Sequence, residues 1–393
     1  MNFLSEYLSY TSHYESPGSF WKWSGYAIVA AVLRDNCYRL AGDIKVCANT
    51  YTLLLADSAV QRKDNPIDLC ELFVRSVDNT KIISGRGSIQ GIIDELQRAE
   101  TDPKSGRLIK GGSAIFIASE LSAALVQDPQ SVNILTDLYK YRDEYSERLR
   151  GRQDKFKVKN VCFTMFSASN KDLLLDVYDV RAMKGGLLGR TFLVTPNEFR
   201  PGNSLFSVVR KEEQFSWLKK ELTEISRIKG EFKFDVDAEK AYDDWYLPFR
   251  ESYKEKGDAS GIAGRIHTGV LKLAMIICII HTKALQVIKC HIEEAIEECI
   301  ALMPNYNQFL MASGKSKDNS EIGTIIITEL YNSPGNMMSR EKIFQKHWNA
   351  FDAEQFDKLM ATLTQAKLVQ EFHDGTVMTY KLTEKCKEML FKK

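Results

Sequence analysis

The sequence predicts an α/β protein whose core is a parallel β-sheet flanked by helices. Between residues 46 and 204, short apolar runs alternate with amphipathic segments of helical periodicity, which is the pattern of strand–helix–strand units. From about residue 205 the pattern is helical, and the polar stretch ASGKSKDNS then precedes a smaller C-terminal part. We therefore expect four regions: a helical one at 1–45, the α/β core at 46–204, a helical region at 205–312 and a C-terminal domain at 318–393.

The composition is that of a soluble globular protein, with 44% hydrophobic and 27% charged residues. Because the net charge is +1, a nucleic-acid-binding surface must be a local patch. The N-terminal stretch lacks the basic start and apolar block of a signal peptide, and the longest apolar run, GVLKLAMIICIIH, is too short to span a bilayer. The eight cysteines form no CxxC pair, as expected of reduced thiols. We therefore expect a cytoplasmic protein without membrane contact.

The first elements follow from periodicity and capping. The stretch FWKWSGYAIVAAVLRDN has apolar residues at helical spacing, and NTYTLLLAD is a short apolar run that suits a buried parallel strand. The next segment, NPIDLCELFVRSV, predicts a helix with Asn65 as its N-cap, Pro66 in its first turn and Asp68 near its positive end.

Four further apolar runs predict strands, and an amphipathic helix capped by Ser88 follows the first of them; the runs are TKIISG, SAIFIASE, NVCFTMFSASN and GRTFLVTP. Ligands bind to sheets of this kind at the carboxyl ends of the strands. Those ends carry Asp57, Glu120, and Ser169 with Asn170. The sequence thus places its polar candidates where a parallel sheet places its site.

The C-terminal part reads as three helices and a hairpin, which is the pattern of a winged helix. An Asp374–Gly375 turn lies between two alternating segments, and Asp352 with Gln355 resembles a capping box. The helix DAEQFDKLMATLTQAKL, with Lys358 and Lys367 outward, is a candidate DNA-binding element. A protein-docking role is equally open.

The stretch LLLADSAVQRKDNPIDLC has the layout of a phosphate-binding loop between a strand and a helix. If Lys63 is the lysine that reaches the phosphates, Asp57 and Arg62 stand where such loops have glycine, and Asp64 stands at the Ser/Thr position. Glycines suit these loops because the backbone needs positive φ there. The alternative is a surface loop with two cations. The candidate nucleotide-binding residues of this loop are Ser58, Arg62, Lys63 and Asp64.

Glu120 ends the strand SAIFIASE, where nucleotide-hydrolysing proteins carry an Asp that holds Mg²⁺ and a Glu that orients water. Here Ser119 occupies the Asp position, so Asp64 and Ser119 are the metal-site candidates. Asn170 can position an attacking water, or it can cap the following helix. An ordinary strand-end carboxylate is the alternative for Glu120.

Two arginines and a basic segment complete the candidates. Arg190, in GGLLGRTFLV, can act on a neighbouring subunit's nucleotide or form a surface salt bridge, and Arg265 can reach a γ-phosphate. The alternation in KFKVK predicts a hairpin with cations on one face, suited either to phosphate-backbone contact or to a solvated edge. Its cations are Arg148, Arg150, Arg152, Lys155, Lys157 and Lys159.

Taken in order, these motifs resemble the ATPase region of phage and mobile-element replication proteins, a family of MCM-like or primase-helicase-type AAA+ ATPases. The resemblance covers about residues 20 to 300 and is carried by stretches such as ISGRGSIQGIIDEL, SELSAALVQDP, LTDLYKY, NVCFTMFSASN and GGLLGRTFLV. It implies an AAA+-like P-loop sheet, a helical lid at 205–312 and a ring, expected to be a hexamer, that hydrolyses ATP with Mg²⁺ and moves along single-stranded or forked DNA. A primase is an expected partner, and the cytoplasm of a bacterial host the expected location.

The resemblance also implies residue roles. Lys63 would hold phosphates, Glu120 would polarise water and Asn170 would be the first sensor. Arg190 would be the finger given to the neighbouring subunit, and Arg265 the second sensor. The phosphate (Walker A) loop is degenerate in this chain, which leaves a second interpretation: a catalytically inactive ATPase-fold subunit for DNA binding or assembly.

Overall fold

The computed structural model of the protein describes two compact units, Met1–Tyr306 and Asn307–Lys393. Residues 1–45 and 205–306, expected as regions of their own, belong with the α/β core to the first unit. The residues that the structure describes are 2–57, 61–78, 80–84, 89–98, 100–101, 108–109, 111–122, 131–147, 156–177, 186–204, 209–256, 262–312, 319–347, 353–374 and 377–391.

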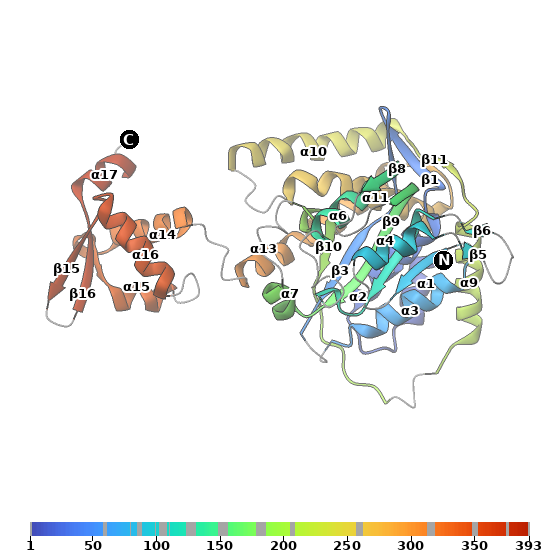
Figure 1. The fold of residues 1–393 in the computed structure, drawn as a ribbon, viewed down its shortest axis with the longest axis horizontal. Coiled ribbons are helices and arrows are strands. Elements are labelled where there is room, and N and C mark those ends of the chain that lie inside the picture. Colours follow the sequence, from blue (N-terminus) through green and yellow to red (C-terminus); the bar gives the residue numbers. More distant parts are fainter. Residues whose placement is uncertain are drawn as a thin grey trace. The chain divides into compact units, whose positions relative to one another are not determined.

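A six-stranded sheet forms the centre of the first unit (Figure 1). Five strands run parallel in the order β10-β3-β9-β7-β4, and β8 pairs antiparallel with the beginning of β9. The predicted parallel sheet flanked by helices is thus confirmed. The strands are β3 (Tyr51–Leu55), β4 (Lys81–Ser84), β7 (Ser113–Ala118), β8 (Arg142–Glu147), β9 (Phe156–Ser169) and β10 (Thr191–Val194).

Helices cover both faces of this sheet. Helices α2 and α3 pack against each other and against the sheet, and α4 contacts β4, β7 and β9. The crossover through α3 runs in the opposite direction from the crossover through α4, so the right-handed rule puts them on opposite faces. These helices and the short elements near them are α1 (Phe3–Tyr10), α2 (Gly18–Leu33), α3 (Asp64–Arg75), α4 (Ile89–Gln97), α6 (Ser131–Leu138), α7 (Lys171–Val177), η1 (Leu188–Arg190), β5 (Glu100–Thr101) and β6 (Leu108–Ile109).

The first region is not helical throughout, as the sequence interpretation had it. Strands β1 (Cys37–Ala41) and β2 (Ile44–Cys47) form a hairpin, with β11 (Gly230–Glu231) beside β1. The turn between the strands contains Gly42 at φ 61°, a conformation that favours glycine. The prediction was wrong here because the helix of this region was extended past its actual end at Leu33.

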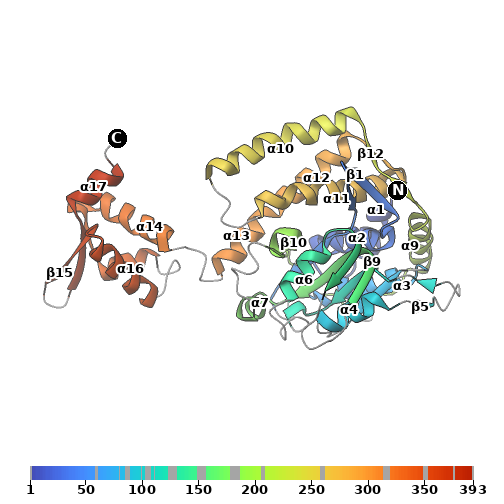
Figure 2. The ribbon, with the colours of Figure 1, turned by 45° about the horizontal axis from the view of Figure 1, so that its top comes forward.

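The helical region lies against this core. Helices α10, α11 and α12 contact one another, with α10 on the outside, and α11 also contacts α2 (Figure 2). Helix α11 is the one described helix that is long and apolar enough to cross a membrane, but 72% of its apolar window is buried inside the unit. That burial is expected of a core helix. The elements are α9 (Glu212–Ile225), β12 (Lys233–Phe234), α10 (Val236–Lys256), α11 (Ala263–Thr282), β13 (Gln286–Val287), α12 (Lys289–Ala301) and α13 (Met303–Ala312).

A buried lysine joins α11 to the sheet. Lys272 is 3% exposed, and its Nζ donates to the Asn49 Oδ1 at 2.6 Å and to the carbonyl oxygens of Asn49 and Tyr139 at 3.0 and 3.4 Å. The Asn49 amide donates in turn to the carbonyls of Tyr139 and Phe163. This network ties α11, the residues before β3, the end of α6 and β9 together. Burial lowers the pKa of Lys272 to about 8, because the ammonium is removed from water.

The second unit contains the expected three helices and hairpin around a core of its own. Strands β15 and β16 pair antiparallel, so the predicted hairpin is confirmed; its turn and the Asp352 cap lie outside the described residues. A third strand, β14, and a last helix were not predicted. The elements are α14 (Asn319–Asn332), η3 (Pro334–Asn336), β14 (Met337–Ser339), α15 (Arg340–His347), α16 (Ala353–Gln365), β15 (Val369–Asp374), β16 (Val377–Leu382) and α17 (Glu384–Phe391).

Replacing Lys272 with Met should flatten the pH dependence of stability above pH 8. The folded-state pKa of Lys272 lies at about 8, below its ordinary value of 10.5. Between these values the unfolded chain binds a proton that the folded chain does not. The free energy of unfolding therefore gains up to about 1.4 kcal/mol per pH unit from this group, a gain that Lys272→Met removes. Urea unfolding of both proteins at several values between pH 7.5 and 10 measures it.

Lys289→Met is the matched control. Lys289 is an exposed lysine on α12 that pairs with Glu293 at 3.5 Å, so its loss should leave the slope unchanged. Parallel pH profiles for the wild-type chain and Lys272→Met would contradict the assignment.

Candidate functional site

The strand order places a topological switch point at the carboxyl ends of β3 and β9. From β3 the chain crosses toward β4 at one edge of the sheet, whereas from the adjacent β9 it crosses over to β10 at the other edge. Connections that leave neighbouring strands in opposite directions open a crevice between them, and ligands of open α/β sheets bind there. Three sequence-predicted residues, Lys63, Glu120 and Asn170, meet at this place.

Glu120 is the centre of this group, which we call the Glu120 cluster. Its Oε1 accepts hydrogen bonds from the hydroxyls of Ser122, at 2.6 Å, and Ser169. Its Oε2 accepts from the Asn170 backbone N–H at 3.3 Å and lies 3.4 Å from the Lys63 Nζ. Both carboxylate oxygens are therefore occupied, and the side chain is fixed from three segments of the chain.

These contacts keep Glu120 ionised. Burial by itself raises the pKa of this carboxyl group. The hydrogen bonds from Ser122 and Ser169 lower it, as do the Lys63 charge and the Asn170 N–H, and together they outweigh burial. The pKa of Glu120 therefore lies below its ordinary value. A carboxylate of this kind orients a water molecule better than it removes a proton.

Lys63 is buried at the start of α3, with 9% of its surface exposed. The helix begins at Asp64, one residue before the predicted N-cap Asn65, so Pro66 stands in the first turn and Lys63 directly precedes the helix. The expected cap was wrong because the backbone of Lys63 already has helical dihedrals. Lys63 thus lies between strand β3 and helix α3, and the helix begins after it.

Arg62 stands at the position where phosphate-binding loops have glycine. Its φ is 45°, the left-handed conformation that glycine adopts without strain and that costs another residue about 1–2 kcal/mol. Its guanidinium Nε donates to the Glu15 Oε2 at 2.9 Å, and its carbonyl accepts from Ser16. The loop therefore keeps the positive φ that was expected to require glycine, and the Arg62 side chain bonds to Glu15.

The other candidate residues at the carboxyl end of the sheet have no described contact with the Glu120 side chain through their own side chains. Asp64 and Ser119 are both exposed, and no group of three or more His, Cys, Asp or Glu suited to a metal occurs among the described residues. Ser58 lies outside them. The Asn170 Oδ1 accepts from the backbone N–H groups of Asp172 and Leu173, which confirms the alternative that Asn170 caps α7. Sequence reasoning missed Ser122 and Ser169 as donors to Glu120, although both stand next to predicted strand ends.

Arg190 and Arg265 lie at the opposite end of the sheet. Arg190 directly precedes β10, whose first residue, Thr191, is paired with Tyr51 at the start of β3. Since β3 has five residues and rises about 3.3 Å from one to the next, its first and last residues are about 13 Å apart. Arg265 shares a pocket with Arg190. Within one chain, neither arginine joins the Glu120 cluster.

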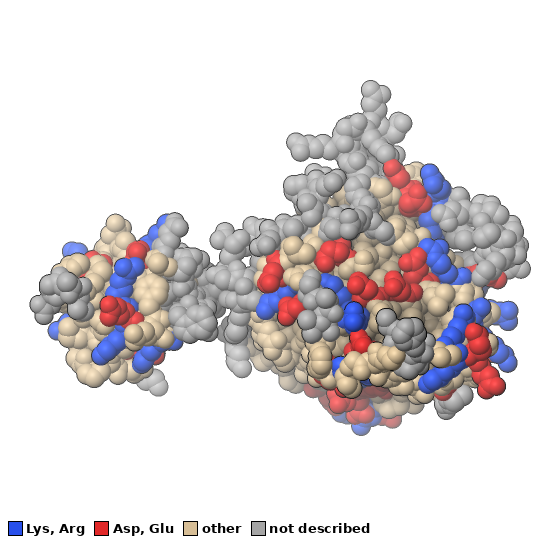
Figure 3. Space-filling view, turned by 90° about the horizontal axis from the view of Figure 1, so that it is seen from below, with Lys and Arg blue, Asp and Glu red and all other residues tan. Residues whose placement is uncertain are grey.

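The expected basic hairpin exists, formed by β8 and the first residues of β9. It extends beyond the amino end of the sheet, because β9 begins to pair with β7 only at Cys162. Lys157 pairs with Glu144 at 2.8 Å and Lys159 is exposed. The remaining four cations of the hairpin, Arg148, Arg150, Arg152 and Lys155, lie outside the described residues. On the face of the protein that Figure 3 shows, acidic side chains lie among the basic ones.

In the second unit, Lys358 on α16 and Lys367 just after it are exposed, as predicted. The neighbouring Asp357 binds Arg340 through both carboxylate oxygens, at 2.8 and 2.9 Å. The described charged side chains of this helix, Asp357 and Lys358, are therefore of opposite sign and adjacent.

Comparison with protein-family models and with curated proteins finds no match to this chain. The functional conclusion accordingly rests on the geometry of the two ends of the sheet.

Glu120→Gln should destabilise the protein at neutral pH by about 1–2 kcal/mol, since it removes a charged hydrogen-bond acceptor that has several donors. The pKa of Glu120 is depressed by folding, so its contribution is full above the ordinary Glu pKa of about 4.3 and is lost as the pH falls through the folded-state value. The difference between wild type and Glu120→Gln should therefore shrink from pH 7 to pH 4. Urea unfolding at both pH values measures it.

Glu71→Gln serves as the control, because the exposed pair of Glu71 with Arg75 on α3 should contribute less than about 0.5 kcal/mol. Equal stability of wild type and Glu120→Gln at pH 7 would show that the cluster does not hold the carboxylate.

Proposed function

We propose that the protein is an ATPase of the AAA+ type that acts in DNA replication, with its nucleotide site in the crevice between β3 and β9. The observation that carries this proposal is the meeting of Lys63 and Glu120, which are 57 positions apart in the chain, at the switch point of the sheet. A buried ammonium and an ionised carboxylate at the carboxyl ends of parallel strands are two of the groups that ATP-hydrolysing proteins use, one for the phosphates and one for water.

Each residue of the cluster has a role in this proposal. Lys63 exchanges its contact with Glu120 for the phosphates of ATP, and Glu120 then orients the attacking water. Ser122 and Ser169 hold the carboxylate in place while Lys63 moves. Mg²⁺ is commonly held by one or two carboxylates together with substrate phosphates, so the exposed Asp64 is the residue of this chain suited to it.

The two arginines support an oligomer. Arg190 and Arg265 lie at the end of the sheet opposite to Lys63, so they can act on a nucleotide bound at Lys63 only if that Lys63 belongs to a neighbouring copy. Contacts between unlike ends of identical chains form a closed ring when the rotation closes. We propose a ring, expected to be a hexamer, with nucleotides at the subunit interfaces.

DNA is the polymer along which the protein is proposed to move. The β8–β9 hairpin, with Lys157 and Lys159 on its described part, is proposed to contact the phosphate backbone of single-stranded or forked DNA. The second unit, with its helices and the β15–β16 hairpin, is proposed to be a winged helix that binds DNA through α16 or docks a partner such as a primase. The mixed charge of α16 favours the docking role.

A second candidate function is a scaffold built on an inactive ATPase fold, which binds DNA or assembles with a partner. Three observations favour it. Asn170 is already used as a helix cap, Lys63 is already paired, and Ser119 stands where a metal-binding Asp belongs. The two functions differ in one property, which is turnover of ATP.

The purified chain should hydrolyse ATP with Mg²⁺, faster in the presence of single-stranded DNA. Lys63→Ala and Glu120→Gln should each lower the rate by about 100-fold or more, since each removes a group that acts on the transferred phosphate or on water. Phosphate release with and without single-stranded DNA measures this.

Arg62→Ala is the matched control, because this adjacent cation is bound to Glu15 and should retain most of the rate. Full activity of Lys63→Ala would refute the assignment of the site. Absence of turnover in the wild-type chain, with DNA binding intact, would establish the scaffold instead.

Mixing two inactive variants should restore activity if Arg190 acts on a neighbour. Rings that contain both Lys63→Ala and Arg190→Ala have interfaces at which an intact Lys63 meets an intact Arg190. We expect such mixtures to hydrolyse ATP while each variant alone does not. Failure of the mixture, in spite of mixed oligomers seen by native mass spectrometry, would place the action of Arg190 within its own chain.

A further inference from the structure

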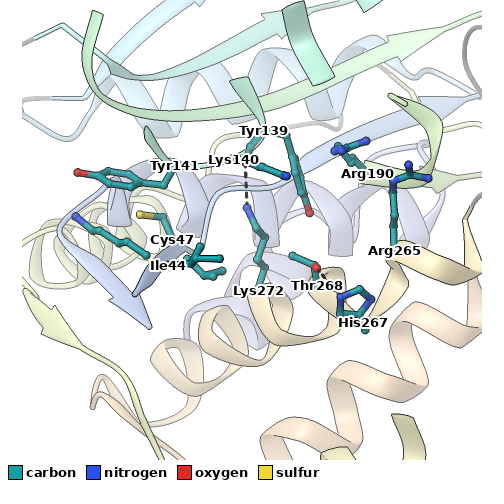
Figure 4. Close-up of a pocket in the computed structure, with 12 residues that line it drawn as sticks. Ile44, Cys47, Tyr139, Lys140, Tyr141, Arg190, Arg265, His267, Thr268 and Lys272 are labelled. Carbon is teal, nitrogen blue, oxygen red and sulfur yellow. Dashed lines mark hydrogen bonds between the residues drawn. The ribbon is translucent and has the colours of Figure 1, made fainter. Parts of the chain in front are cut away.

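A second pocket lies at the amino end of the sheet, away from the Glu120 cluster. It has a volume of about 450 Å³, within the range of about 300–1,000 Å³ typical of small-molecule sites. Its walls come from β2, the residues that follow α6, Arg190 before β10, and the first half of α11 (Figure 4). Residues far apart in sequence thus converge on one cavity.

The charge of this pocket is one-sided. Five cationic side chains line it, and no Asp or Glu does so in the part of the chain that the structure describes. A protein of net charge +1 would otherwise be expected to distribute acids among them, as it does on the visible face of Figure 3. The cations are Lys45, Lys140, Arg190, Arg265 and Lys272. The cavity is therefore suited to an anion.

Lys272 adds a buried positive charge to this cavity. It is 3% exposed, and the hydrogen bonds of its Nζ all go to neutral oxygens, those of Asn49 and Tyr139. Its ammonium also lies 4.0 Å from the centre of the Tyr139 ring. A buried charge is costly unless an opposite charge compensates it, and these partners supply hydrogen bonds without charge. An anion in the cavity would supply the opposite charge.

The arginines add geometry. Arg190 and Arg265 lie next to each other at one end of the cavity (Figure 4). Burial lowers the pKa of Arg190, and repulsion from Arg265 lowers it further. Two neighbouring guanidinium groups match the oxygens of a phosphate, with which arginine forms two parallel hydrogen bonds. Tyr141, half-buried, lies at the opposite end of the cavity, where its ring can contact a base.

We propose that this pocket binds a nucleotide through its phosphate, with the phosphate at Arg190 and Arg265 and the base toward Tyr141. The ligand is either a free nucleoside phosphate or a nucleotide of a single strand, since both present the same phosphate and base. The site belongs to a single copy of the chain. It does not depend on ATP binding at Lys63.

The test uses the full chain with Lys63→Met, which removes the proposed ATP site. Fluorescent ATP and a fluorescent twelve-residue oligothymidylate are titrated separately into this protein, and anisotropy is followed. We expect Arg265→Met or Lys140→Met, added to Lys63→Met, to weaken the binding of one of the two probes at least tenfold; for ATP we expect one site per chain. Lys289→Met, added in the same way, should have no effect, because Lys289 lies on α12 outside the pocket.

The probe whose binding these pocket substitutions weaken identifies the source of the nucleotide, since binding of single-stranded DNA to the β8–β9 hairpin does not depend on them. Binding that is present in the wild-type chain and abolished by Lys63→Met alone would overturn the proposal and locate the ligand at the Glu120 cluster. Absence of binding by both probes, or binding unchanged by Arg265→Met and Lys140→Met in variants with a wild-type circular dichroism spectrum, would overturn it as well. ATP hydrolysis is measured separately, so failure of this pocket leaves the proposed ATPase untouched.

Discussion

Strand β9 is hydrogen-bonded to β3 on one side and to β7 on the other, and the candidate functional groups take their places from this arrangement. Its last residue, Ser169, lies between the strand that leads to Lys63 and the strand that leads to Glu120. The carboxylate can therefore accept hydrogen bonds from the end of β9 and contact Lys63 at the same time. Because the strands are buried, apolar packing fixes their register. The polar groups at the strand ends are therefore held in fixed positions relative to one another.

The same sheet separates two kinds of chemistry. One end carries an ionised Glu120 held by hydroxyls and an ammonium, and the other end carries five cations around a cavity. Lys272 fixes the second end, because its network joins α11 to the residues before β3. A chain whose two ends are unlike is suited to contacts between copies in which one end meets the other. The proposed ring follows from this polarity more directly than from any single motif.

Much of the sheet could be predicted because its strands are short apolar runs bounded by polar residues, and the carboxyl-end rule then places Glu120 near Lys63. The β1–β2 hairpin could not be separated from the preceding helix by apolar spacing, although its Gly42–Asp43 pair is a turn signal. Ser122 and Ser169 were not predicted as partners of Glu120, because hydroxyls at strand ends are common and only tertiary structure selects these two. The cationic pocket was not foreseen either, since Lys272 stands inside the apolar run LKLAMIICIIH, where periodicity indicates a core helix. The position of the Lys272 side chain depends on its hydrogen bond to Asn49, which is more than 200 positions away in the sequence.

Hydrogen–deuterium exchange of the full chain with and without Mg²⁺–ATP tests the central claim most directly, because it reports where the nucleotide binds. The account predicts slower exchange in peptides that cover residues 61–66 and 169–173, the two segments that meet at the Glu120 cluster. This protection should disappear in Lys63→Met. Unchanged exchange in both segments at saturating ATP, or protection that persists in Lys63→Met, would contradict the claim that the crevice between β3 and β9 is the nucleotide site.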